Sequence, residues 1–231
     1  MDVLGGGGGR AAKVVYNAVP SLGPEATADS AHPDRREGVL YVGNAGDRKR
    51  CNVLPFMLRG LHARMPGVQL TLAGLVPGEV PRLVGLFREL RVEESVVWAG
   101  KLRTGALDDL YRRASVVVVP SASEGLPMVI LEALRAGTPC VATRVSGHPE
   151  AIEDGVNGFL VGVDDPEEMA ERCARLLSDP ELAERMGQAG REAVRERFSV
   201  GQQCERYLAA YRDILLSPGS EVNGERRLDQ A

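Results

Sequence analysis

Short runs of apolar residues recur along the chain, and a segment with helical periodicity follows nearly every one of them. The runs are continuously apolar and do not alternate in polarity, which is typical of parallel strands covered on both faces. This alternation of strand and helix indicates an open, doubly wound α/β sheet. The predicted strands are 13–17, 39–43, 69–74, 96–99, 115–120, 140–143 and 158–161. The predicted helices are 51–64, 79–91, 106–113, 127–136, 147–153, 166–177, 180–196 and 200–215.

The two ends of the chain differ in composition from the part between them. Residues 1–12 contain an unbroken run of glycines, which is entropically costly to order, so we expect a disordered linker there. Residues 217–231 are mostly polar, and we expect a flexible tail. A single domain is therefore expected to occupy residues 13–216.

Composition and charge argue against several classes of function. The net charge is −4, so no overall basic field attracts nucleic acid. Aromatic residues make up only 4%, which disfavours binding of single strands by base stacking. No apolar run approaches the roughly 20 residues that span a bilayer, and the N-terminus lacks the apolar stretch of a secretory signal. We expect a cytoplasmic protein with no nucleic-acid partner and no transmembrane segment, and peripheral contact with a membrane stays open.

No group of residues has the spacing of a metal site. The cysteines lie far apart and form neither a CxxC pair nor a cluster with histidine, so we expect reduced, buried thiols. Asp164 and Asp165 precede a proline that begins a predicted helix, and Asp108 and Asp109 lie at the start of another. Acids at helix starts are explained by capping and by the helix dipole. We therefore expect no metal ion.

Two loops at the carboxyl ends of predicted strands carry the polar groups that a ligand needs, and ligands of open α/β sheets bind at such ends. The first loop, 44–50, reads NAGDRKR, and the second, 120–127, reads PSASEGLP. In the second loop Gly125 lets a ligand approach the backbone, and Pro127 removes a donor that the next helix does not use. The free N–H groups of that helix carry roughly half a unit of positive charge, which suits an anion or sugar hydroxyls.

Two glutamates in this segment are candidate ligand contacts. Glu124 lies at the opening of the ligand site expected at the start of this helix, where its carboxylate can accept hydrogen bonds from sugar hydroxyls. Glu132 lies among apolar neighbours in the helix, where a carboxylate needs hydrogen-bond partners such as a ribose diol. The simpler interpretation is that Glu124 caps the helix and that Glu132 faces solvent. An assignment of the two glutamates as the acid and the nucleophile of a glycosidase is disfavoured. Both carboxyl groups would have to flank one bond, whereas eight helical residues separate them by about 12 Å.

Two further side chains lie near these loops without a defined task. His148 falls in a turn beside the predicted strand ends. A turn histidine with no catalytic role is the simpler interpretation, and a contact with the ligand stays open. Trp98 lies at a strand end, and we expect it in the core and not as a platform for base stacking.

Several spaced motifs follow Pro120 in order, which is a much stronger signal than a lone glycine motif. They are a Glu-x7-Glu pair whose first Glu precedes Gly-x-Pro, then Ala-x-Gly-x-Pro, Gly-x-Pro-Glu and Asp-Gly-x-x-Gly. About residues 13–216 resemble the Rossmann-like donor-binding domain of the retaining GT-B glycosyltransferases of family 4, which is one half of a GT-B enzyme. The motifs are Glu124 and Glu132, Gly125-Leu126-Pro127, Ala136-Gly137-Thr138-Pro139, Gly147-His148-Pro149-Glu150 and Asp154-Gly155-Val156-Asn157-Gly158.

The resemblance implies a role for each residue of the second loop and its helix. It implies that Glu124 contacts the donor sugar and that Glu132 contacts the ribose. The backbone of Gly125, Leu126 and Met128 is then expected along the sugar and the diphosphate.

The resemblance also implies the roles of the first loop. The family carries an Arg directly after the strand-ending Gly and a Lys five residues later, and both hold the diphosphate leaving group. Lys49 occupies the Lys position, whereas Asn44 stands at the Arg position and brings no charge. Arg48 and Arg50 stay open as substitutes. The predicted catalytic residues are Glu124 and Lys49, and the predicted binding residues are Asn44, Arg48, Lys49, Arg50, Gly125, Leu126, Pro127, Met128 and Glu132.

The implied reaction is retaining transfer of a hexosyl group from a UDP or GDP sugar to an unidentified acceptor, with no further cofactor required. In the family an acceptor-binding domain comes first, so we expect this chain to work with such an N-terminal domain, in a full-length enzyme or as a second chain. Two alternatives stay open. One is a non-catalytic nucleotide-sugar binding module, which Asn44 favours. The other is a GT-B sugar-nucleotide epimerase, against which the Glu-x7-Glu and Gly-x-Pro pattern argues.

Overall fold

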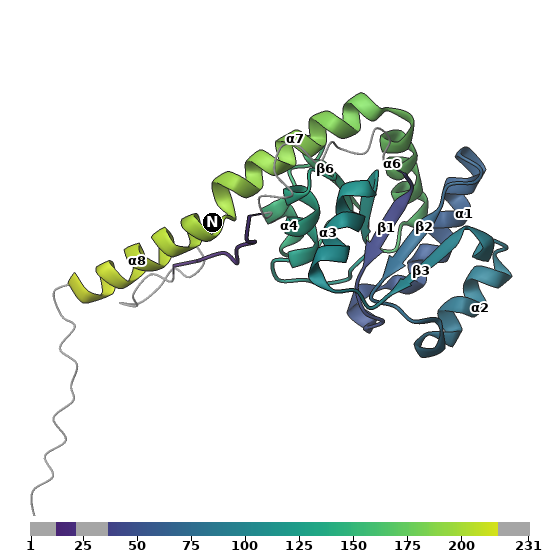
Figure 1. The fold of residues 1–231 in the computed structure, drawn as a ribbon, viewed down its shortest axis with the longest axis horizontal. Helices are drawn as coiled ribbons and strands as arrows, with labels where there is room; N and C mark the ends of the chain where they lie inside the picture. Colours follow the sequence, from purple (N-terminus) through teal and green to yellow (C-terminus); the bar gives the residue numbers. More distant parts are fainter. Residues whose placement is uncertain (1–12, 22–36, 217–231) are drawn as a thin grey trace, which may run out of the picture.

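The centre of the computed structural model, which describes residues 13–21 and 37–216, is a six-stranded parallel sheet (Figure 1). Its order is β3-β2-β1-β4-β5-β6, which confirms the doubly wound α/β prediction. The order reverses between β1 and β4, so the crevice at their carboxyl ends is the switch point at which such sheets bind ligands. The strands are β1 (Val39–Val42), β2 (Leu70–Ala73), β3 (Val96–Gly100), β4 (Val116–Val119), β5 (Cys140–Thr143) and β6 (Gly158–Val161).

Helices cover both faces of the sheet. In β4, Val116 and Val118 pack into a hydrophobic cluster with α1, α2 and α6, while Val117 and Val119 face a second cluster with α3, α4, α5 and the end of α7. This burial on both faces explains why the strands are continuously apolar in sequence. The helices are α1 (Leu54–Arg64), α2 (Pro81–Glu89), α3 (Thr104–Arg113), α4 (Met128–Arg135), α5 (His148–Ala151), α6 (Pro166–Ser178), α7 (Pro180–Arg197) and α8 (Val200–Leu216).

Local sequence signals set several helix ends. The Asp165 carboxylate accepts a hydrogen bond from the backbone N–H of Glu168 at 2.8 Å and caps α6. Asp179 caps α7 in the same way through the N–H of Leu182, at 2.9 Å. Gly137 follows α4 with φ of +74°, a left-handed conformation that favours glycine.

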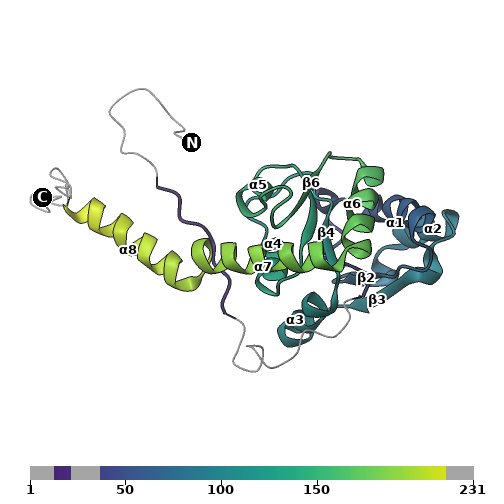
Figure 2. The same cartoon turned by 90° about the horizontal axis from the view of Figure 1, so that it is seen from above.

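The prediction of a strand at 13–17 is wrong. Residues 13–18 form no strand, and Val19 makes only an isolated bridge to Ser199. This segment lies outside the sheet, beside α8 (Figures 1 and 2). There the Tyr16 ring packs on Phe198, with 5.5 Å between ring centroids. Its apolar residues are therefore explained by contact with the helices. The predicted linker at 1–12 and tail at 217–231 lie outside the described residues.

Helix α8 extends away from the sheet (yellow in Figure 1; Figure 2). None of its residues is buried. No helix in the ranges 13–21 and 37–216 is long and apolar enough to cross a membrane. The large apolar side chains exposed on α8 are Val200, Tyr207, Leu208, Tyr211, Ile214, Leu215 and Leu216.

The cysteines are free thiols, as predicted, but they are not all buried. Cys140 and Cys173 are buried, Cys51 is half-buried, and Cys204 is exposed on α8 because that helix lies outside the core. Within the described part of the chain, no three His, Cys, Asp or Glu side chains gather in a cluster that would hold a metal ion.

Candidate functional site

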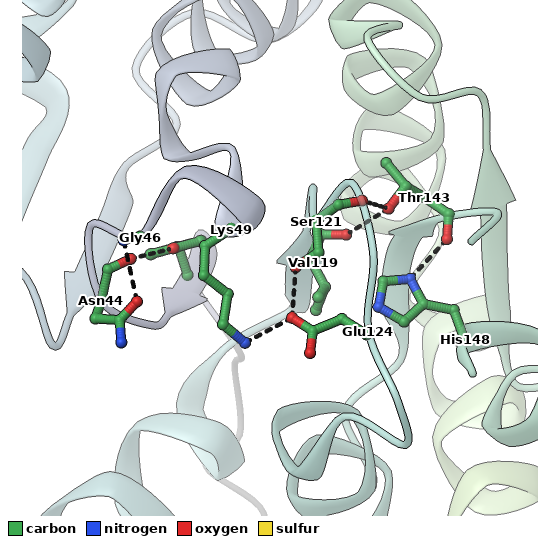
Figure 3. Close-up of polar contacts among 9 residues, drawn as sticks. Asn44, Gly46, Lys49, Val119, Ser121, Glu124, Thr143 and His148 are labelled. Carbon is green, nitrogen blue, oxygen red and sulfur yellow. Dashed lines mark hydrogen bonds and ion pairs between the residues drawn. The ribbon is translucent and has the colours of Figure 1, made fainter. Parts of the chain in front are cut away.

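The two predicted ligand loops meet at the switch point between β1 and β4 (Figure 3). The backbone N–H of Ala122, in the loop after β4, donates to the carbonyl of Arg48, in the loop after β1, at 2.8 Å. Between the loops lies a hollow of about 450 Å³, called the switch-point hollow below. The fold thus brings together two segments that are far apart in sequence. Residues lining the hollow are Asn44, Gly46, Asp47, Arg48, Lys49 and Glu124.

Lys49 and Glu124 form an ion pair across the switch point. The Lys49 Nζ lies 2.6 Å from the Glu124 Oε1, and the Ser121 hydroxyl donates to the same oxygen at 2.9 Å. The Lys49 and Glu124 side chains are 29% and 16% exposed. Burial alone would raise the pKa of Glu124, but the hydrogen bonds from Lys49 and Ser121 and the lysine charge hold it below its usual value. Glu124 is therefore ionised near neutral pH and can only accept hydrogen bonds.

The loop after β4 is held from the side of β5. The Thr143 hydroxyl donates to the carbonyl of Ser121 at 2.5 Å, and the N–H of Gly147 donates to the carbonyl of Glu124 at 3.2 Å. A Cβ at position 147 would lie only 1.5 Å from the carbonyl oxygen of Gly125. Only glycine fits there, and the position of the Glu124 backbone depends on that close packing.

His148 lies on the opposite side of this loop from Lys49 and does not line the switch-point hollow (Figure 3). It is fully buried, and its Nδ1 lies 2.6 Å from the carbonyl oxygen of Thr143. A carbonyl only accepts, so Nδ1 carries the proton. Burial lowers the pKa of His148, which favours the neutral ring. Its Nε2 has no hydrogen-bond partner in the part of the chain that the structure describes.

The remaining predicted residues of the loop after β1 take different places. The Asn44 side-chain oxygen accepts a hydrogen bond from the N–H of Gly46 at 3.1 Å, so that oxygen is used within the loop. Arg48 lines the switch-point hollow and is exposed. Arg50 is not among the lining residues, and its guanidinium pairs with Asp164.

Helix α4 begins at the edge of the loop after β4. Pro127 is the residue before the helix, and no side chain caps the first turn, which starts at Met128. The first N–H groups of a helix have no partner within the helix, so an uncapped start can receive a ligand. Gly125 and Leu126 lead into this turn, with Gly125 exposed to solvent. The four predicted binding residues of this segment, Gly125, Leu126, Pro127 and Met128, therefore directly follow Glu124 in the chain.

Glu132 is half-buried one turn further along α4 and does not line the hollow. Its Oε2 accepts a hydrogen bond from the hydroxyl of Tyr111, in α3, at 2.8 Å. Sequence reasoning missed Tyr111, since only the packing of α3 on α4 brings the two together. It also missed Thr143 and Ser121, although the spacing of Ser121 three residues before Glu124 is a usable signal.

The fold and the site define a doubly wound α/β domain with a polar, mixed-charge site at its switch point, the class of domain that binds nucleotides. The family model of glycosyl transferases group 1 matches residues 24–193. The chain is 34% identical over 202 residues to D-inositol 3-phosphate glycosyltransferase from Acidothermus cellulolyticus, covering 81% of this chain and 45% of that protein. It is 35% identical over 144 residues to N-acetyl-alpha-D-glucosaminyl L-malate synthase from Bacillus anthracis, covering 61% of this chain and 37% of that protein. The chain belongs to the glycosyl transferases group 1, glycosyltransferase family 4.

Solved structures agree with this assignment. Sucrose-phosphate synthase from Thermosynechococcus elongatus superposes with a TM-score of 0.76 at 28% identity, covering 88% of this chain and 52% of that one. Anabaena HepE in complex with UDP-glucose superposes with a TM-score of 0.73 at 23% identity, covering 88% of this chain and 59% of that one, a likeness of fold alone. The chain spans about half the length of the relatives it matches. It corresponds to the C-terminal half of a GT-B glycosyltransferase.

Proposed function

We propose that this chain is the donor-binding half of a retaining glycosyltransferase, which moves a hexosyl group from a UDP or GDP sugar to an acceptor held by a separate N-terminal domain. One observation carries the proposal. Lys49 and Glu124 lie 2.6 Å apart at the switch-point hollow, so a cation suited to a diphosphate stands beside a carboxylate suited to sugar hydroxyls.

The diphosphate, the sugar and the ribose of a nucleotide sugar each have a matching group in this arrangement. Lys49, Arg48 and the uncapped start of α4 would hold the diphosphate. Glu124 would accept hydrogen bonds from the sugar hydroxyls, and Glu132 would accept them from the ribose. Because the two glutamates lie on either side of the first turn of α4, a donor bound across that turn would reach both.

The reaction breaks the bond between the anomeric carbon and the diphosphate oxygen, and negative charge develops on the leaving diphosphate. Lys49 and the start of α4 would stabilise that charge, and preorganised groups of this kind commonly contribute several kcal/mol. The acceptor hydroxyl would attack from the face that the diphosphate leaves and give its proton to the leaving phosphate. Glu124 is held ionised by Lys49 and Ser121, which suits it to positioning the sugar and not to acting as an acid.

A non-catalytic nucleotide-sugar binding module is the second candidate, and Asn44 favours it. The family's Arg is replaced there by a neutral side chain whose oxygen is bonded to the N–H of Gly46. Mixing the chain with a separately produced acceptor domain of a relative distinguishes the candidates. Transfer or hydrolysis of the donor supports the enzyme, whereas donor binding without turnover supports the module.

Calorimetric titration of the chain with UDP and GDP sugars tests donor binding itself. We expect one of the two nucleotides to bind, and Lys49→Ala to weaken that binding. Lys101→Ala is the matched control, because Lys101 is 67% exposed and pairs with Glu79 away from the hollow. If neither nucleotide sugar binds at millimolar concentration, the proposal is wrong.

A further inference from the structure

Tyr111 is a buried polar side chain that the proposed chemistry does not yet use. It lies in the last turns of α3, has no exposed surface, and donates its hydroxyl to the Glu132 Oε2 at 2.8 Å. Burial, and then the neighbouring charge of Glu132, raise the pKa of Tyr111 well above its usual value. The hydroxyl therefore stays protonated and remains a donor to the carboxylate at any physiological pH.

The helix that carries Tyr111 is itself fixed to the region of Glu132. The Thr138 hydroxyl donates to the backbone carbonyl of Tyr111 at 2.5 Å. Arg135, in the last turn of α4, pairs with Asp108 of α3 at 2.5 Å, and the two side chains are only 12% and 22% exposed. These contacts fix the position of the Tyr111 hydroxyl, and its hydrogen bond in turn holds the Glu132 carboxylate.

The single hydrogen bond from Tyr111 leaves most acceptor sites of the Glu132 carboxylate available for a ligand. A carboxylate has about four lone-pair sites on its two oxygens. The Glu132 Oε1 receives no hydrogen bond from residues 13–21 or 37–216. A glutamate side chain has three freely rotating bonds, and holding one of its oxygens reduces the conformations in which the other faces the ligand.

We propose that Tyr111 is a positioning residue, which aims the Glu132 carboxylate at the 2′- and 3′-hydroxyls of the donor ribose and so makes the site select ribonucleotides over 2′-deoxyribonucleotides. This inference rests on the proposed function, which assigns the ribose to Glu132. Tyr111 itself acts through Glu132 and does not touch the nucleotide.

Calorimetry with the full chain tests the inference. The probes are UDP or GDP, whichever binds the wild-type chain more tightly, and its 2′-deoxy counterpart. We expect the wild type to prefer the ribonucleotide about tenfold, which corresponds to about 1.4 kcal/mol. Tyr111→Phe should lose most of this preference, while its affinity for the deoxynucleotide stays within about twofold, since only the ribose contact depends on Glu132.

Two further variants separate positioning from general structure. In a Glu132→Gln background, adding Tyr111→Phe should cause no further loss, because the tyrosine acts through the carboxylate. Tyr16→Phe is the matched control, since the Tyr16 ring packs on Phe198 and Tyr16 takes no part in the hydrogen bond between Tyr111 and Glu132. It should keep the full preference. Thermal unfolding of each variant checks the fold, and Phe preserves the ring that fills the buried position.

The outcomes distinguish this inference from the proposed function. If Glu132→Gln removes the preference but Tyr111→Phe keeps it, or weakens both nucleotides equally, Tyr111 is a structural residue and the inference is wrong. If the wild type shows no preference, or Glu132→Gln retains it, the assignment of ribose to Glu132 fails, and the role of Tyr111 fails with it.

Discussion

The loops after β1 and β4 face the same hollow but are held in different ways. The loop after β4 has a buried Ser121 and Pro127, and Thr143 and Gly147 hold its backbone from the side of β5. Residues 44–48 of the loop after β1 are all exposed. The difference indicates that the loop after β4 sets the geometry of the site, while the loop after β1 supplies positive charge that can adjust to a ligand.

The largest effect is expected from Gly147→Ala, which tests the fixed loop. The added methyl would overlap the Gly125 carbonyl, so the loop must move. Overpacking of this kind costs typically about 1–3 kcal/mol of stability. We expect that loss in urea unfolding, and nucleotide binding weakened by more than about a hundredfold, since the start of α4 shifts with the loop.

Gly85→Ala is the control for this change. It lies in α2, and a Cβ there meets no atom within 4 Å. Replacing an exposed helical Gly by Ala should raise stability by up to about 1 kcal/mol. Normal nucleotide binding by Gly147→Ala would show that the geometry of the loop after β4 is not what the site depends on.

Lys49→Ala tests the charge supplied by the loop after β1. Charge-assisted hydrogen bonds contribute about 1.5–3 kcal/mol, so calorimetry should show nucleotide-sugar affinity reduced about 10- to 100-fold. The melting temperature should change little, because a partly exposed ion pair contributes about 1 kcal/mol or less. If Lys49→Ala binds the nucleotide sugar as tightly as the control Lys101→Ala does, Lys49 does not contribute to donor binding.

Asn44→Arg asks whether the charge missing from the loop after β1 can be restored. We expect binding of the nucleotide diphosphate to tighten about threefold to tenfold, with a gain that shrinks as salt is added. Calorimetry at low and high ionic strength measures both effects. No gain would indicate that the Arg48 guanidinium already meets the diphosphate, whereas a gain that is independent of salt would show that it does not come from the added charge.

The smallest expected effect is the pH dependence of the ion pair between the loops. The folded-state pKa of Glu124 lies below its usual 4.5, so the pair adds stability above that pH and loses it as the pH falls through the folded value. Because the pair is partly exposed, the contribution is about 1 kcal/mol or less. Urea unfolding of the wild type and Glu124→Gln should differ more at pH 7 than at pH 3, and an equal difference at both would contradict this.

The sequence predicted the sheet well because both of its faces are buried. Six of the seven predicted strands occur, and the run at 13–17 fails because apolar residues also pack on helices outside the sheet. Helix ends at Asp165 and Asp179 were predictable because the caps and their N–H partners are three residues apart.

The site was only partly predictable. The motifs and the strand ends indicated Lys49 and Glu124, which the structure places in contact. The pairing of Arg50 with Asp164 and of Tyr111 with Glu132 had no local signal. Those contacts depend on how helices and loops pack against one another, which periodicity and spacing do not encode.

The adjacency of β1 and β4 also affects how this molecule folds. Lys49 and Glu124 are 75 residues apart in sequence, and the strands and helices between them are α1, β2, α2, β3, α3 and β4. Contacts that close such long loops form at a high cost in chain entropy and slow the folding of a domain. The hollow therefore exists only once both halves of the sheet have joined, so nucleotide binding would report complete folding and stabilise only the fully folded chain.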